Sequence, residues 1–241
     1  MNRDKDDMDM NLKDLIDLGI IDPPYRNKIA STILKAIHVL FCPQKISLWL
    51  KTFFLDIKYG PYLGKRSSNG NFERGWWGSI NSNYDALAAM FSKITIRSND
   101  VLVDIGCGKG RVFNFFLNCG FKNKLIGVEV DPVIAKITKQ RLHKYRQIEI
   151  VTGAIENEGV FPIEGTIFYL FNPFSEAIVK SFSDQLAKKI NDGIFKISDR
   201  PLIVYYYCYY LNVFEENPIW NVKRLDTQFD SAIIYPRVIA T

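Results

Sequence analysis

Val101–Arg111 reads V-L-V-D-I-G-C-G-K-G-R, an apolar run followed by an acid and then by three alternating glycines. Continuous apolar runs are typical of parallel strands covered on both faces, so Val101–Ile105 is predicted to be a buried strand. Glycine tolerates positive φ and lets a ligand approach the backbone, so Gly106, Gly108 and Gly110 predict a sharp turn into a helix. The amides of that helix would face a nucleotide-shaped ligand.

Two features of this turn argue against a dinucleotide. The fingerprint G-x-G-x-x-G requires glycine at its sixth position, where this chain has Arg111. Asp104 would repel a pyrophosphate but can pair with an α-ammonium group. The stretch D-I-G-C-G-K-G resembles the first motif of class I S-adenosylmethionine (SAM) methyltransferases, whose cofactor carries an amino acid end and no phosphate. This resemblance implies that SAM is bound by Asp104, Gly106, Gly108 and Gly110.

The composition predicts one sizeable α/β domain with an extension. The chain has 241 residues, of which 47% are hydrophobic and 24% charged, which suffices to bury one core. The formal charge is +5, but the basic residues are dispersed, as on an ordinary solvated surface. The four cysteines have no paired spacing and follow no secretory signal, so we expect a reduced, cytoplasmic protein. Since His38 and His143 are the only histidines, we expect no metal site.

Residues 1–83 are predicted to be a helical extension. Apolar residues recur at helical spacing in Ile29–Leu40 and in Ile46–Ile57, but neither segment has the roughly 18 apolar residues that cross a bilayer. These helices are expected to pack against the core or a partner chain, or to lie on a membrane surface. The glycine-rich loop around Trp76 and Trp77 is interpreted either as a lid over the cofactor or as an ordinary packed connector.

A second strand is predicted at Leu125–Val130 and contains an acid near its end. Glu129 follows Gly110 by 19 positions, close to the roughly 20 expected for a carboxylate that binds ribose hydroxyls. The sequence G-V-E-V-D-P resembles the second motif of the same methyltransferases, which implies this role for Glu129. Asp131 is the competing acid, but its place before Pro132 fits a helix N-cap better.

The third strand is predicted at Ile148–Val151, and the loop after it reads T-G-A-I-E. In methyltransferases of this kind an acid and a small residue usually follow this strand and hold the adenine. The acid before the small residue is absent here. The resemblance therefore implies only that Ala154 and Ile155 form the adenine wall, and it leaves the role of Glu156 open.

The fourth strand is predicted at Thr166–Leu170 and is followed by F-N-P-F at residues 171–174. This corresponds to the motif in which many methyltransferases place acceptor-binding residues, with N-P-P-Y or D-P-P-Y in enzymes that methylate planar amines. The resemblance implies that Asn172 contacts both acceptor and cofactor and that Phe174 stacks on the acceptor. F-N-P-F is also similar to the form found in a bacterial group labelled as RNA methylases, but no basic groove with interleaved aromatics supports a nucleic acid.

Further strands at Pro201–Tyr207, Val222–Leu225 and Ile233–Val238 complete the predicted fold. We expect a doubly wound α/β domain at residues 84–241, with a mostly parallel seven-stranded sheet that ends in an antiparallel C-terminal hairpin. The helical extension of residues 1–83 precedes it.

The resemblance implies methyl transfer from SAM to a nitrogen or oxygen acceptor by direct displacement. The acceptor is left open as a small molecule, a protein or RNA. The alternative is a non-catalytic SAM-binding module that acts through its N-terminal helices on a partner or membrane surface. An NAD-dependent oxidoreductase comes third, because Arg111 and Asp104 disfavour it.

Overall fold

The computed structural model describes residues 43–60, 63, 80–171, 174–195 and 201–237 of the chain. By its contacts the chain divides into two units, Met1–Lys51 and Thr52–Thr241, and the division falls inside helix α3 (Pro43–Lys58). The last turns of α3 thus group with the sheet, whereas the sequence assigned all of residues 1–83 to an extension.

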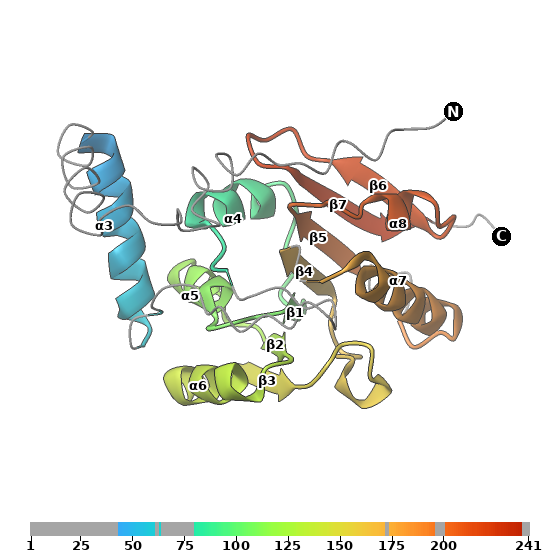
Figure 1. The fold of residues 1–241 in the computed structure, drawn as a ribbon, viewed down its shortest axis with the longest axis horizontal. Helices are drawn as coiled ribbons and strands as arrows, with labels where there is room; N and C mark the ends of the chain where they lie inside the picture. The colour runs from blue at the N-terminus through green and yellow to red at the C-terminus, as the bar shows by residue number, and fades with distance from the viewer. Residues whose placement is uncertain (1–42, 61–62, 64–79, 172–173, 196–200, 238–241) are drawn as a thin grey trace, which may run out of the picture. The chain divides into compact units, whose positions relative to one another are not determined.

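The unit Thr52–Thr241 contains a seven-stranded sheet with the order β3-β2-β1-β4-β5-β7-β6 (Figure 1). The neighbours among β1 to β5 are parallel, and β7 pairs antiparallel with both β5 and β6. The predicted fold, with its antiparallel C-terminal hairpin, is confirmed. The strands are β1 (Leu102–Ile105), β2 (Leu125–Glu129), β3 (Ile148–Thr152), β4 (Ile167–Phe171), β5 (Leu202–Tyr206), β6 (Trp220–Arg224) and β7 (Ser231–Pro236).

Helices cover both faces of this sheet: α4, α5 and α6 lie on one face, and α7 and α8 on the other (Figure 1). None of the helices in the described part of the chain is long and apolar enough to cross a membrane. The helices are α4 (Tyr84–Phe91), α5 (Arg111–Asn118), α6 (Pro132–Leu142), α7 (Glu176–Asn191) and α8 (Asn212–Glu215), with a 3-10 turn at Glu158–Val160.

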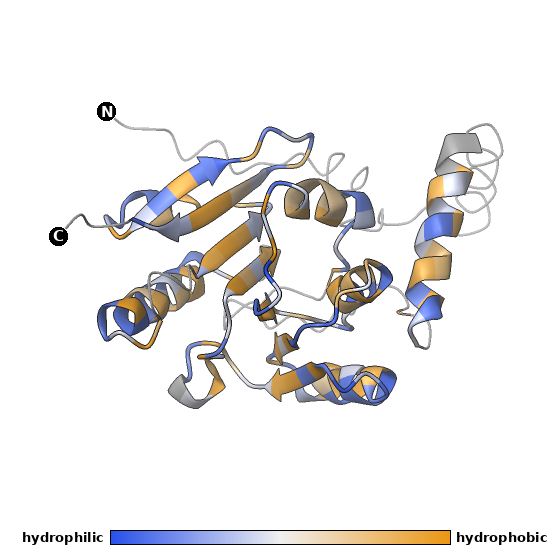
Figure 2. Ribbon diagram, turned by 180° about the vertical axis from the view of Figure 1, so that it is seen from behind, coloured by the Kyte–Doolittle hydropathy of each residue, from blue (hydrophilic) through white to orange (hydrophobic). Residues whose placement is uncertain are grey.

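The core consists of two layers because side chains alternate along each strand. Val103 and Ile105 of β1 pack in the layer under α7, while Leu102 packs in the layer under α4 and α5. The central strands β4 and β5 are mostly hydrophobic, and the edge strand β6 is mostly hydrophilic (Figure 2). The continuous apolar runs of the sequence are therefore the strands buried on both faces, as predicted.

Two helix ends form as their sequence signals indicate. The Asp131 carboxylate caps α6 and accepts hydrogen bonds from the amides of Val133 at 2.8 Å and Ile134 at 3.2 Å, so its predicted capping role is confirmed. Gly120 follows α5 with φ of 76°, the left-handed conformation in which glycine commonly ends helices.

Candidate functional site

The carboxyl ends of β1, β2 and β4 meet at one edge of the sheet. Ile105, near the end of β1, pairs with Val128 of β2 on one side and with Leu170 of β4 on the other. The chain runs outward from β1 to β3 and then returns to β4 on the opposite side of β1. In open α/β sheets, ligands bind outside the carboxyl ends of the strands at such a reversal. This edge is the candidate site.

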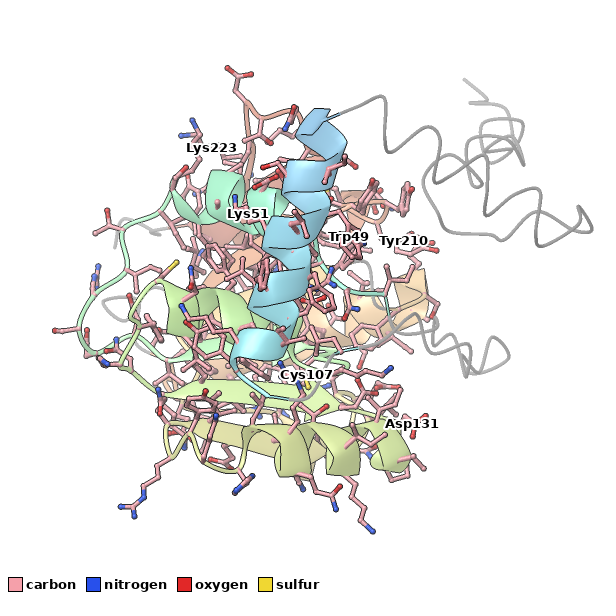
Figure 3. All side chains as sticks on the ribbon, turned by 90° about the vertical axis from the view of Figure 1, so that its left-hand side faces the viewer. Trp49, Lys51, Cys107, Asp131, Tyr210 and Lys223 are labelled. Carbon is pink, nitrogen blue, oxygen red and sulfur yellow. The ribbon has the colours of Figure 1, made fainter. Side chains whose placement is uncertain are left out.

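Glu129 is buried at this edge and holds the glycine turn. Its Oε2 accepts a hydrogen bond from the Gly108 amide at 2.8 Å, and its Oε1 accepts one from the Asp131 amide at 2.9 Å. Cys107 and Asp131, on the two loops that flank this carboxylate, are labelled in Figure 3. Burial raises the pKa of Glu129, and the two amides oppose that rise. Each carboxylate oxygen has a second lone pair, which leaves it able to accept a further hydroxyl.

Asp104 lies beside Glu129 and is 3% exposed. Burial, followed by the charge of Glu129, raises the pKa of Asp104 well above its usual range. Among the described residues, none donates a hydrogen bond to its carboxylate. A cation beside this carboxyl would offset both its burial and the Glu129 charge, so this position fits a cationic, hydrogen-bonding group such as an α-ammonium. The cofactor implied by the sequence carries such a group.

The glycine turn is also held from behind by α6. The Thr138 hydroxyl donates to the Gly108 carbonyl at 2.7 Å, and an Arg141 guanidinium nitrogen donates to the Lys109 carbonyl at 3.3 Å. Gly110 has φ of 83°, and a Cβ there would lie 2.9 Å from the Phe113 ring. These hydrogen bonds therefore hold the backbone of the turn, and Gly110 leaves no room for a side chain.

A buried polar group, here called the Asp56 cluster, connects the end of α3 to the helix that follows the glycine turn. Asp56 accepts hydrogen bonds from Arg111, with Nε to Oδ1 at 3.0 Å and Nη2 to Oδ2, and from the Tyr84 hydroxyl at 2.9 Å. Asn114 and Arg141 also belong to the cluster. Arg141 Nη2 donates a hydrogen bond to Asn114 Oδ1 at 2.6 Å. Arg111, the departure from the dinucleotide fingerprint, is thus engaged in an ion pair rather than directed at a phosphate.

The loop after β3 lies next to the end of β2. The Gly153 amide donates to the Glu129 backbone carbonyl at 2.9 Å, which brings Ala154 close to the candidate site. Ile155 is 1% exposed and packs in the core layer under α7. One carboxylate oxygen of Glu156 is buried without a described partner. The adenine-wall role of Ala154 and Ile155 stays a prediction.

The end of β4 differs from the expectation for Phe174. Phe174 is 6% exposed and packs in the core layer under α7, so its ring is not presented to an acceptor. Phe171, three residues earlier, is instead the half-buried aromatic at this edge. Asn172, Trp76 and Trp77 lie outside the described residues, and their expected roles stay predictions.

Several residues at the site have little or no signal in the sequence. Asp56 is a charged residue within the apolar pattern of an amphipathic helix. From the sequence alone, such a residue could be paired in the interior or exposed to solvent. Thr138 and Arg141 lie on a helix whose other basic residues are exposed, and only the fold shows that these two turn inward.

Sequence comparison gives one partial relative. The chain matches no protein-family profile. It is 27% identical over 84 residues to "Putative methyltransferase 235L" of Invertebrate iridescent virus 6, a match that covers 34% of this chain. The chain spans about a third, 31%, of the curated relative that it matches.

Solved structures of similar fold include several methyltransferases. The SAH-bound methyltransferase PaMTH1 of Podospora anserina is 11% identical, with a TM-score of 0.49 over 90% of this chain and 100% of that chain. An RNA methyltransferase from Salinibacter ruber in complex with S-adenosyl-L-homocysteine (SAH) is 16% identical, with a TM-score of 0.43 over 67% and 97% of the two chains. At these identities the similarity concerns the fold, which in this chain rests on the strand order and pairing given above.

Proposed function

We propose that this chain, which has the fold of the class I SAM-dependent methyltransferases, binds SAM at the carboxyl edge of β1 and β2 and transfers its methyl group to an acceptor. The observation that carries the proposal is the buried pair Asp104 and Glu129 beside a rigid glycine turn. A carboxylate without a donor suits an ammonium group, and a carboxylate at the end of the next strand suits ribose hydroxyls. We assign this activity to the domain at residues 84–241.

The proposed contacts follow from the chemistry of each position. Asp104 pairs with the α-ammonium, and Glu129 accepts from the ribose while it keeps its two amide donors. The turn residues Gly106, Gly108 and Gly110 let the cofactor approach the backbone. Ala154 and Ile155 remain the proposed adenine wall, and Asn172 the proposed contact to acceptor and cofactor.

Bound SAM supplies a methyl group on a sulfonium centre, and the chain supplies positioning and exclusion of water. A neutral nitrogen acceptor needs no general base, whereas a hydroxyl acceptor does. Burial raises the pKa of Tyr206 at the end of β5 and so keeps its hydroxyl protonated. Tyr206 is therefore a poor general base for a hydroxyl acceptor.

Calorimetric titration with SAM, SAH and NADH tests the cofactor. We expect SAM and SAH to bind and NADH not to bind; tighter binding of NADH would contradict the proposal. Transfer of labelled methyl from SAM into a fractionated cell extract then tests catalysis, with Asn172→Ala expected to lower transfer while it leaves SAM affinity nearly unchanged. SAM binding with no labelled product from any fraction would favour the non-catalytic module instead.

A further inference from the structure

The surplus positive charge of the chain is concentrated in one part of the fold. Residues 105–148, which contain α5, α6 and the loops around them, include nine basic residues and two acidic ones. Nine minus two gives a net charge of +7, whereas the whole chain has +5. The two acids, Glu129 and Asp131, both lie at the carboxyl edge of the sheet. The sides of α5 and α6 and the loops at the amino edge therefore carry basic residues without acids between them.

Two lysines and two tyrosines form a contiguous group at the amino edge. The Lys58 ammonium lies 5.1 Å from the centre of the Tyr59 ring, and the Lys144 ammonium lies 5.1 Å from that of Tyr145. The two rings meet edge to face, with centroids 6.1 Å apart. Asn118, the last residue of α5, accepts a hydrogen bond from Lys58 at 2.8 Å and one from the Tyr59 hydroxyl at 3.2 Å. The order across this surface is therefore lysine, tyrosine, tyrosine, lysine.

Lys122 and Arg146 extend this group along the amino edge. The amide of Leu125, the first residue of β2, donates to the Gln147 carbonyl at 2.8 Å, so the loops before β2 and β3 run side by side. Lys122 lies in the first loop and Arg146 in the second. The four basic residues are exposed and the two tyrosines are half-buried. The six residues are here called the basic–aromatic patch: Lys58, Tyr59, Lys122, Lys144, Tyr145 and Arg146.

The charges of the basic–aromatic patch are not neutralised within the described part of the chain. None of its four basic residues forms an ion pair with a described residue. Two acids of the same edge, Glu149 and Glu164, are both bound by Lys124. Neighbouring positive charges repel one another and attract polyanions. The sequence predicted dispersed basic residues because the patch is assembled from three segments that meet only in the folded chain.

We propose that the basic–aromatic patch binds a single-stranded nucleic acid, with phosphates on the basic residues and bases stacked on the tyrosine rings. Phosphates and bases alternate along such a strand, so positive surfaces with interleaved aromatic side chains bind it. A membrane surface fits less well, because it attracts basic helices with an exposed apolar face. On α6 the exposed apolar residues, Val133 and Ile137, lie in the first half of the helix, toward the carboxyl edge.

The test measures the fluorescence anisotropy of a labelled oligoadenylate of about 12 nucleotides, titrated with the full chain in the absence of SAM and SAH. We expect the logarithm of the association constant to fall with the logarithm of the salt concentration, with a slope of about −2.8 for four phosphate contacts. An oligodeoxyadenylate of the same length should bind within about three-fold, because phosphates and bases are common to both strands. The absence of binding by both strands overturns the proposal.

Charge variants locate the binding surface. Lys58→Gln combined with Lys144→Gln should reduce the size of the salt slope by about 1.4, because two phosphate contacts are lost, and should weaken binding about ten-fold at low salt. The matched control is Lys188→Gln combined with Lys223→Gln, which removes the same charge from exposed positions on α7 and β6. The control should change affinity less than about two-fold. Equal losses from the two double variants would overturn the assignment to the patch.

Stacking on the tyrosines is tested separately from charge. An abasic strand of equal length and charge should bind the wild-type chain about ten-fold more weakly than oligoadenylate. Tyr145→Leu keeps an apolar side chain at this half-buried position and should lose the same factor while it retains the salt slope. Equal affinities for the abasic and the adenylate strands would overturn the stacking, and this comparison uses the wild-type chain, so it stands even if Tyr145→Leu does not fold.

Vesicles of phosphatidylcholine and phosphatidylglycerol provide the competing anionic surface. We expect them to bind the chain more weakly than oligoadenylate at equal concentrations of anionic groups. Tighter binding to the vesicles, lost in the Lys58→Gln and Lys144→Gln double variant, would overturn the proposal in favour of a membrane surface. The patch lies at the edge of the sheet opposite the candidate site, and the assay contains no SAM, so none of these outcomes depends on the proposed methyl transfer.

Discussion

The two halves of the sheet's carboxyl edge are built by different means. At the ends of β1 and β2, backbone amides fix the turn around one carboxylate, since Glu129 accepts from Gly108 and from Asp131. At the ends of β4 and β5, stacked rings form the edge and Tyr207 is strained. The first half depends on short sequence spacing. The second half depends on the register of distant strands, because Phe171 of β4 meets Tyr206 of β5 only in the folded sheet.

The largest effect should come from breaking the Asp56 cluster. This cluster packs against α5, the helix that follows the glycine turn, and so supports the ends of β1 and β2, here called the cofactor half. The Asp56 side chain is 2% exposed and that of Arg111 is 15% exposed. Asp56→Ala leaves the Arg111 guanidinium without its carboxylate partner and the Tyr84 hydroxyl without its acceptor, and we expect the free energy of unfolding to fall by about 3–5 kcal/mol. Urea unfolding measures the loss. Asp56→Ala combined with Arg111→Met should lose less than Asp56→Ala alone, because the Arg111 charge is removed together with the carboxylate that pairs with it.

A surface ion pair provides the control for that experiment. Lys180 and Asp184 are both more than half exposed, so Asp184→Ala should cost only about 0.3–0.5 kcal/mol. Equal losses from Asp56→Ala and Asp184→Ala would contradict the assigned importance of the Asp56 cluster.

The next effect concerns Glu129 within the cofactor half. Glu129→Ala removes the proposed ribose contacts and the acceptor of two backbone amides. Loss of charged hydrogen bonds of this kind costs about 1.5–3 kcal/mol, which corresponds to a fall in SAM affinity of about 10- to 100-fold by calorimetry. Glu149→Ala, an exposed acid on β3, is the matched control and should leave affinity unchanged. A Glu129→Ala chain that folds and binds SAM as tightly as wild type would remove Glu129 from the site.

A smaller, pH-dependent effect should distinguish Asp104 from its neighbours. Because its pKa is raised, the free protein holds a proton there, and an α-ammonium would favour the ionised form. Affinity for SAH, which carries the same ammonium, should rise up to about ten-fold per pH unit below the raised pKa and level off above it. Without ligand, stability should fall as pH rises from about 3.9 toward the raised pKa, because the native state holds this proton longer than the unfolded state.

Calorimetry in buffers of different ionisation enthalpy measures this coupling directly. SAH binding should release a proton in the wild type and not in Asp104→Asn. Binding with no proton release below the raised pKa would show that Asp104 does not face the ammonium.

The contrast between the two halves also explains what could be predicted from the sequence. Local spacing determines the geometry within one strand–helix–strand unit, and this unit contains Asp104, the three glycines and Glu129. The role of Asp56 could not be predicted, because its partners lie 28 and 55 residues away and meet it only in the folded chain. Phe174 was assigned by motif position, but it lies three residues beyond the end of β4 and packs in the layer under α7, whereas Phe171 packs in the other layer.

The smallest effect tests the division of roles between two acids, Glu129 at the end of β2 and Asp131 after it. The Asp131 carboxylate is the N-cap of α6 and bonds to the amides of Val133 and Ile134, while its own amide donates to Glu129. Asp131→Ala removes the cap but keeps the amide, so the free energy of unfolding should fall by about 1 kcal/mol while SAM affinity changes less than about two-fold. Asn83→Ala, which removes the comparable cap of α4 away from the edge, should cost a similar amount. If Asp131→Ala instead weakened SAM binding as strongly as Glu129→Ala, the ribose contact would belong to Asp131, and Glu129 would serve only to fix the turn.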